Sequence, residues 1–366
     1  MMAIAKKAEY SNLAQKVKRA LLLALSVSFV PLFSFPAFSI TPDEVVSLAT
    51  QNQGKITFTG KRIHRLQRQN LALLANMKIY HQNASNYRVI VSEPAGLAGT
   101  NLWLDDNKAR VFFPMEGLMF KNDNPTGSYE AASIIFGSIT PELSLLKANY
   151  NLQLLESGYV AMQPCHVLKL VPKRGYRTPG HTFWISKENG QILKEERTWG
   201  EHIDPYFSSY YEEFHPVGMA DTAVSVPRGV QTVDLKRQDK NSLMMYRSIA
   251  DAEAAINGKV PLPSFVPDGF ALHNIQFASF FGTRITLLNY TDGANWLIIS
   301  YRPKPNMFVT MMAGAMALNL IEKMNQLSFQ APYNYYATEK SNNLIFAYGD
   351  LYPDDLKRVG ESMSLK

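Results

Sequence analysis

The sequence predicts an α+β fold: a large curved antiparallel β-sheet, a half-barrel that covers short helices, and then a smaller C-terminal α+β domain. Two observations predict this fold. Strand-like alternation of apolar and polar residues recurs between residues 55 and 214, which is typical of an antiparallel meander with one face in water. Residues 260–270, VPLPSFVPDGF, combine three prolines with five apolar side chains, so a stiff extended segment with buried side chains begins a second domain.

The first 39 residues predict a cleaved signal peptide. A basic segment precedes the apolar residues 20–33, and Ala37 and Ser39 are the small residues expected before a cut that follows Ser39. A membrane anchor is the alternative, but Pro31 and Pro36 shorten the apolar run below the roughly 18–20 residues of a spanning helix. We therefore expect an exported, periplasmic protein.

Length and composition narrow the class of protein further. A chain of 366 residues is long enough for two domains with cores of their own. The net charge of +6 includes +4 from the first 39 residues, so the remainder carries only +2, which argues against nucleic-acid binding. Cys165 is the single cysteine, and its place in the alternating residues 160–171 predicts a buried structural thiol rather than a nucleophile or a redox thiol.

The first domain, residues 40–216, begins with a helix and continues with strands. Thr41 is a good N-cap, and Pro42 with two acidic residues suits the first turn, so a short helix is expected to about Thr50. Alternation predicts strands at residues 55–65, 71–81, 87–92, 101–104, 108–113, 151–157, 160–172, 181–186, 192–198 and 208–214. Residues 105–107 and the Asn189-Gly190 pair predict hairpin turns.

Two short helices, expected at residues 130–137 and 140–146, interrupt the strands. They would cover the concave apolar side of a curved sheet, and two interpretations stay open. This side either forms a cavity for an acyl chain or a lipidated partner, or the helices fill it as an ordinary core. For a cavity, the expected ligand contacts are Ile134, Ile135, Phe136, Leu145 and Leu146.

The second domain is expected at residues 248–366, after a linker at residues 217–247. We expect the linker to be solvated; contact of its basic residues with a membrane or an acidic partner is the alternative. A helix at residues 248–258 with a glycine stop opens the domain, and a helix from Pro353 closes it. Between them, strands are predicted at residues 272–281, 283–290, 296–302, 334–338 and 343–348. The methionine-rich residues 307–331 would either fill a core or line a groove for a partner or lipid.

No catalytic constellation is evident in the sequence. The seven histidines form no HExxH motif and no i, i+4 pair, and neither a phosphate-binding loop nor a GxSxG nucleophile elbow occurs. We therefore expect a protein that is not an enzyme and that needs neither a cofactor nor a metal.

Three stretches carry a resemblance to a known family. They are residues 181–197, HTFWISKENGQILKEER; residues 262–270, LPSFVPDGF; and the Tyr290–Gly293 turn together with residues 344–362, LIFAYGDLYPDDLKRVGES. They resemble the strand–turn–strand segment, the Pro-x-x-x-Pro-x-Gly-Phe joint, and the Tyr-x-Asp-Gly turn with closing helix of the MucB/RseB family of periplasmic sigma-factor (sigma-E) regulators. The resemblance implies a LolA-like first domain with an apolar cavity. It also implies a small domain that binds the periplasmic part of a membrane-bound anti-sigma factor until a lipid or lipoprotein signal releases it.

Three functions follow as hypotheses. The first is a negative regulator that binds an anti-sigma factor and senses a lipid or lipoprotein, and the second is a LolA-like periplasmic carrier of lipoproteins or lipids. The third is an enzyme of unrecognised type. A carrier needs only one domain, so the presence of residues 260–366 favours the regulator. The partner surface is expected on the small domain around Tyr290, Trp296, Tyr301 and Arg302, and oligomerisation is left open.

Overall fold

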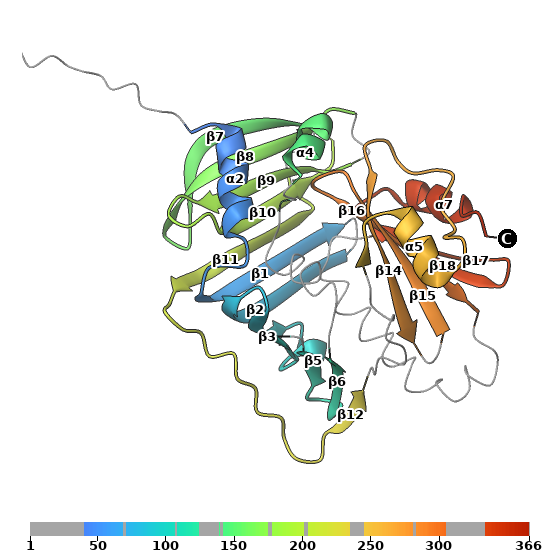
Figure 1. The fold of residues 1–366 in the computed structure, drawn as a ribbon. Coiled ribbons are helices and arrows are strands. Elements are labelled where there is room, and N and C mark those ends of the chain that lie inside the picture. The colour runs from blue at the N-terminus through green and yellow to red at the C-terminus, as the bar shows by residue number, and fades with distance from the viewer. Residues whose placement is uncertain are drawn as a thin grey trace, which may run out of the picture. The chain divides into compact units, whose positions relative to one another are not determined.

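A computed structural model of the chain describes residues 40–68, 71–106, 108–123, 139, 142–174, 178–200, 204–234, 245–280, 283–304 and 334–365. From Thr41 onward the chain forms one compact unit. Its main elements are two β-sheets with short helices beside them, which confirms the predicted α+β fold (Figure 1). The expected signal peptide, the helix expected at residues 130–137 and the methionine-rich residues 307–331 lie outside the described residues.

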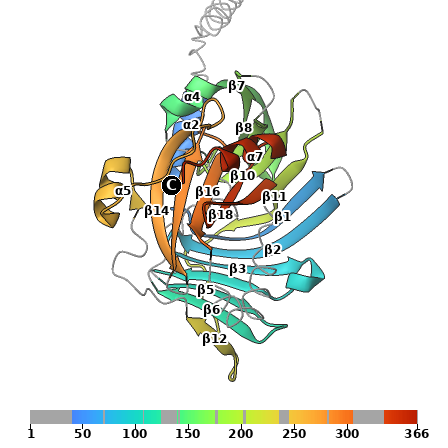
Figure 2. The same ribbon diagram turned by 90° about the vertical axis from the view of Figure 1, so that its right-hand side faces the viewer.

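The larger sheet has twelve strands among the described residues, and it is open because its order runs from β12 at one end to β7 at the other. The order is β12-β6-β5-β4-β3-β2-β1-β11-β10-β9-β8-β7. The strands are β1 (Phe58–Arg68), β2 (Leu71–Asn83), β3 (Asn86–Glu93), β4 (Asn101–Asp105), β5 (Lys108–Phe113), β6 (Leu118–Asp123), β7 (Tyr150–Val160), β8 (Gln163–Pro172), β9 (Gly180–Ser186), β10 (Ile192–Thr198), β11 (Phe207–Pro216) and β12 (Gln231–Asp234). Figure 2 shows how the strands curve. The predicted curved sheet is therefore present.

Alternation along paired strands gives this sheet one apolar face. In the register of β2 and β3, Ile79 lies opposite Val89 and Met77 opposite Val91, and all four side chains are buried. The same face continues through Leu104, Phe113 and Phe120, which belong to the same core cluster. Cys165 is fully buried in this cluster, which confirms the predicted structural thiol, and burial raises its pKa to about 11.

Two helices lie against the β7–β8 end of this sheet (Figure 1). Helix α2 (Pro42–Asn52) begins as predicted, because Thr41 and Glu44 form a capping box. Helix α4 (Leu143–Asn149) begins three residues after the expected position and continues directly into β7. The side chain of its last residue, Asn149, donates to the carbonyl oxygen of Leu145. A 3-10 turn, η1 (Ala95–Leu97), follows β3.

The second sheet has six antiparallel strands among the described residues, in the order β13-β14-β15-β16-β18-β17. The strands are β13 (Met245–Tyr246), β14 (Ala271–Phe280), β15 (Thr283–Thr291), β16 (Trp296–Pro303), β17 (Asn334–Lys340) and β18 (Asn343–Gly349). Helix α7 (Pro353–Glu361) packs on β17 and β18. The proline-rich stretch contributes Val260 to the same core, and Pro263 pairs with Met363 beyond α7, as expected for a stiff segment with buried side chains.

The structure changes two details of the predicted connection. Residues 217–247 are not solvated throughout, because β12 pairs with β6 in parallel and β13 pairs with β14. Ala220 is buried as well, and its backbone N–H donates to Gln82 Oε1. Helix α5 (Ile249–Ile256) is capped by Ser248, but Asn257 rather than the expected Gly258 takes the left-handed conformation at its end. The proposed domain boundaries stay a prediction.

Candidate functional site

Only two of the five expected ligand residues lie in the described part of the chain. Ile134, Ile135 and Phe136 lie outside it, whereas Leu145 is half-buried and Leu146 fully buried in α4. A Cβ atom at Gly293 of the second sheet would lie 2.8 Å from Leu146 Cα, so Leu146 packs against that turn. The ligand-binding role of the five residues stays a prediction.

The four expected partner residues divide between the two faces of the second sheet. Tyr290 and Tyr301 lie in the core on the side of α7, and burial raises the pKa of each phenol to about 12. Trp296 and Arg302 alternate with the buried Leu297 and Tyr301 along β16, so they lie on the opposite face. The four residues therefore form two pairs rather than one surface.

The face that carries Trp296 and Arg302 also carries exposed aromatic side chains, which the sequence analysis missed. Phe346 lies opposite Ser300 of β16 and opposite Ala337 of β17, so Phe346 and Tyr335 share this face with Arg302. Tyr335 is 70% exposed and Phe346 is 38% exposed. The available signal was the alternation in residues 334–338, but the adjacent tyrosines at 335 and 336 conceal which of them points outward. We call Arg302, Tyr335 and Phe346 the outer face of the second sheet.

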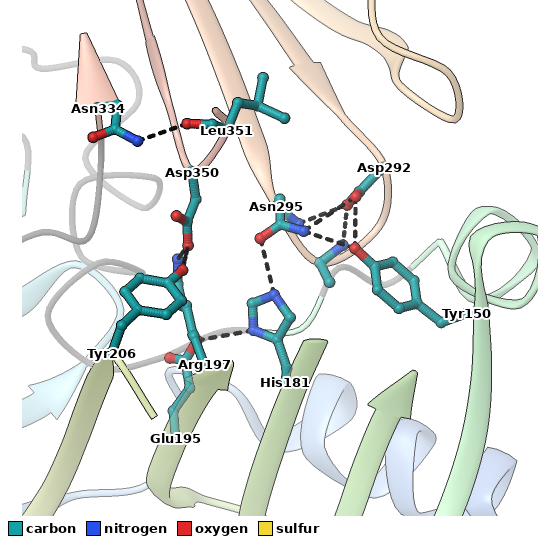
Figure 3. A network of polar contacts seen from close by, with 11 residues as sticks. Tyr150, His181, Glu195, Arg197, Tyr206, Asp292, Asn295, Asn334, Asp350 and Leu351 are labelled. Atoms are coloured by element: carbon teal, nitrogen blue, oxygen red, sulfur yellow. Dashed lines mark hydrogen bonds and ion pairs between the residues drawn. The ribbon is translucent and has the colours of Figure 1, made fainter. Parts of the chain in front are cut away.

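A buried polar network joins the two sheets (Figure 3). At its centre, the Tyr150 hydroxyl of β7 donates to Asp292 Oδ2 at 2.6 Å, in the turn between β15 and β16. Asn295 Nδ2, in the same turn, lies 2.7 Å from the Tyr150 hydroxyl and 3.1 Å from Asp292 Oδ2. Asn149 Nδ2 donates to the carbonyl oxygens of Gly269 and Asp292. The turn at Thr291–Asn295 is thus held on the first sheet by hydrogen bonds to buried groups.

A second part of the network consists of charged side chains. The Arg197 guanidinium of β10 donates through Nε to Glu195 Oε1 at 2.6 Å and through a terminal nitrogen to Asp350 Oδ2 at 3.0 Å. The hydroxyl of Tyr206 also donates to Asp350, and His181 of β9 lies between Glu195 and Asn295. Arg197 is therefore a buried link between the first sheet and the end of β18. Sequence reasoning missed this network because its members are isolated polar residues from distant strands.

The network gives the folded chain a defined dependence on acid. Burial raises the pKa of Glu195, but the charge of Arg197 and the hydrogen bond and charge of His181 outweigh it, so the pKa falls to about 2. A carboxyl with a depressed pKa stabilises the fold above its ordinary pKa, and this stability is lost as the pH falls through about 2. We expect about 3 kcal/mol of stability to disappear between about pH 4.5 and pH 2. Urea denaturation at several pH values measures this loss of unfolding free energy. If the unfolding free energy of Glu195→Gln fell as steeply with decreasing pH as that of the wild-type chain, the prediction would be contradicted.

A large groove lies next to the network. Its volume is about 1610 Å³, and its walls combine aromatic and charged side chains of β1, β10 and β11 with residues around α7. Among its lining residues are Arg65, Lys194, Trp199, Tyr206 and Tyr352. None of the residues expected to contact a ligand lines this groove. Within the described residues, no group of three His, Cys, Asp or Glu side chains could hold a metal ion, and no helix is long and apolar enough to cross a membrane.

Comparison with known proteins identifies the fold. No protein-family model matches the chain, and no curated protein matches its sequence. The crystal structure of MucB matches with a TM-score of 0.54 at 13% identity, covering 88% of this chain and 97% of MucB. The Pseudomonas aeruginosa MucA/MucB complex matches with a TM-score of 0.53 at 13% identity, covering 89% of this chain and 99% of that chain. A LolA superfamily protein from Nitrosomonas europaea matches at 12% identity over 50% of this chain and 96% of that chain, but its TM-score of 0.24 is too low to argue from. The chain therefore has the fold of MucB, as the resemblance of its motifs predicted.

Proposed function

We propose that this chain is an exported, non-enzymatic regulator that binds the periplasmic part of a membrane-bound anti-sigma factor and so restrains envelope-stress sigma-factor signalling. The observation that carries the proposal is the match with MucB over nearly the whole of both chains, together with the solved complex of MucB with MucA. The motif resemblance supports the anti-sigma factor as the class of partner. The basic and apolar pattern of residues 1–39 supports export to the periplasm.

The outer face of the second sheet is the part of the structure that best fits a protein partner. Tyr335 and Phe346 expose aromatic surface there, and Arg302 adds a guanidinium; these three residue types are enriched in protein interfaces. Trp296 fits less well, because its ring packs edge-on against His273, which is paired with Glu142 before α4. Tyr290 and Tyr301 would act only by supporting this sheet from its core.

The capture of partners from the cell envelope tests this function. The mature chain, residues 40–366, is used to capture proteins from a detergent-solubilised envelope extract. We expect it to retain a single-pass membrane protein that binds a sigma factor on its cytoplasmic side. Tyr335→Ala should reduce the recovery of this protein about ten-fold or more, because truncation of an aromatic hot-spot residue costs about 2 kcal/mol or more. Quantitative mass spectrometry of the retained proteins measures it.

A second exposed tyrosine supplies the control for this experiment. Tyr159, at the end of β7, is 75% exposed and lies on the first sheet, so Tyr159→Ala should leave recovery unchanged. Equal losses in both variants would contradict the assignment of the outer face. Recovery of lipoproteins or lipids without any sigma-factor-binding protein would contradict the regulator and favour the carrier.

A lipid or lipoprotein signal is the second part of the proposal. Its support is the family resemblance. Mass spectrometry of the captured material should therefore detect acyl chains bound to the mature chain. Added lipid of the same kind should lower the recovery of the membrane protein, because the two ligands would favour different states of the chain.

A further inference from the structure

His181 lies between two hydrogen-bond acceptors at the junction of the two sheets (Figure 3). Its side chain is buried, with Nδ1 3.2 Å from Glu195 Oε1 and Nε2 2.9 Å from Asn295 Oδ1. A neutral imidazole carries one N–H donor and one acceptor nitrogen, so it can satisfy only one of these two oxygens. The protonation of the ring therefore depends on whether both neighbours are obligatory acceptors.

Glu195 is an obligatory acceptor. The Arg197 guanidinium donates to its Oε1 at 2.6 Å in a buried ion pair, and a carboxylate paired in this way is ionised and offers no proton. Nδ1 of His181 must therefore carry a hydrogen atom.

Asn295 is held in the orientation that presents its oxygen to His181. The Tyr150 phenol donates its only proton to Asp292, and burial raises the pKa of Tyr150 well above the ordinary value, so this proton stays in place. The Tyr150 oxygen and the Asp292 carboxylate both accept from Asn295 Nδ2. A flipped amide would turn its oxygen toward that carboxylate, so Oδ1 faces His181 and Nε2 must donate as well.

We propose that His181 carries a proton on both ring nitrogens in the folded chain, and that the second proton holds the Thr291–Asn295 turn of the second sheet on the first sheet. The hydrogen bond from His181 to Asn295 would then depend on pH, and we call this bond the latch. Without the Nε2 proton, the nitrogen lone pair would face Asn295 Oδ1, and two acceptors in contact repel each other.

Charged side chains lie on more than one side of the ring. Glu195 of β10 contacts the ring through its carboxylate, which is paired with Arg197, and Tyr150 of β7 meets the ring edge-on. Asp292 of the turn contacts Tyr150 and Asn295. Asp350, which pairs with Arg197, adds a further carboxylate at the end of β18. A hollow of about 260 Å³ beside Asp292 is lined by the further charged residues Arg174, Asp268, Asp355 and Arg358.

The direction of the pH effect follows from this arrangement. Loss of the Nε2 proton at higher pH removes the hydrogen bond from His181 to Asn295 in the turn. Glu195 and Tyr150 keep their protonation states in the neutral and mildly alkaline range. We expect hydrogen exchange of the backbone amides in the turn, corrected for its intrinsic pH dependence, to increase about ten-fold or more as the ring loses this proton.

Nitrogen NMR of the imidazoles in mature wild-type chain tests the proposal directly. The expected result is a His181 ring with two protonated nitrogens at neutral pH, whose deprotonation coincides with the rise in exchange at the turn. A His181 ring with a single proton at neutral pH would overturn the proposal, and this readout does not depend on whether any variant folds.

Two variants separate the latch from a general effect of pH. In His181→Gln, exchange at the turn should become independent of pH, because the titrating group is gone. In the control His166→Gln, which replaces a half-buried histidine on the neighbouring strand β8, the pH dependence should persist. A pH dependence that survives in His181→Gln would overturn the proposal.

Discussion

Substitution of Arg197 by methionine should lower the free energy of unfolding by about 3–5 kcal/mol. Arg197 forms ion pairs with two buried carboxylates, Glu195 and Asp350. Its removal takes this positive charge away from both carboxylates, and because they are buried, water cannot replace it. Methionine preserves much of the side-chain volume, so the expected loss comes from electrostatics rather than from a cavity. Urea denaturation of the mature chain, followed by tryptophan fluorescence and circular dichroism, measures the change.

A half-exposed ion pair supplies the control for this prediction. Lys304 lies 2.8 Å from Glu339, and about half of each side chain is exposed, so Lys304→Met should cost less than about 1 kcal/mol. If Arg197→Met cost no more than Lys304→Met, the buried network would not be what holds β10 to the end of β18.

Substitution of Gly293 by alanine should cost about 3 kcal/mol and should loosen the junction. Gly293 has a φ of +103°, where a side chain is strained, and the new Cβ atom would lie 2.8 Å from Leu146 Cα and 2.9 Å from Leu146 N. Backbone atoms cannot rotate away, so the turn or α4 must move and the hydrogen bond between Tyr150 and Asp292 must lengthen. Denaturation measures the cost, and hydrogen exchange at Thr291–Asn295 measures the loosening.

Gly229 allows backbone strain to be separated from this close contact. Its φ is +84°, but a Cβ atom there would meet nothing within 4 Å. Gly229→Ala should therefore cost about 1 kcal/mol and leave exchange at the turn unchanged. Equal costs in the two variants would show that the close approach of Gly293 to Leu146 contributes nothing.

Most strands with one buried face were predictable, but β6 was missed although its Phe120 is buried in the core. A period of two is imposed on any strand that packs against a core, so residues 71–81 and 296–302 show it, and β2 and β16 lie there. The parallel strand β12 was not predicted, because its sequence QTVD has a single apolar residue. It lies at the end of the sheet, where pairing needs no apolar face. Alternation also gives no strand order, which depends on contacts between distant residues.

The candidate site was less predictable than the fold. Tyr290 and Trp296 were expected at the partner surface of the small domain, but aromatic residues are as common in cores as in interfaces, and only the register separates the two faces. The polar junction escaped entirely, because Tyr150, His181 and Asp292 have no common spacing in the sequence. Only the fold brings these side chains together.

Site-specific photo-crosslinking in living cells tests the proposed function most directly. A photoreactive amino acid at position 335, on the outer face, should crosslink to a single-pass membrane protein that binds a sigma factor, because this position is 70% exposed. The same amino acid at position 159, on the first sheet, should not crosslink to that protein. Crosslinks from position 335 to lipoproteins alone, or the same partner from both positions, would contradict the account of a regulator that binds through its second sheet.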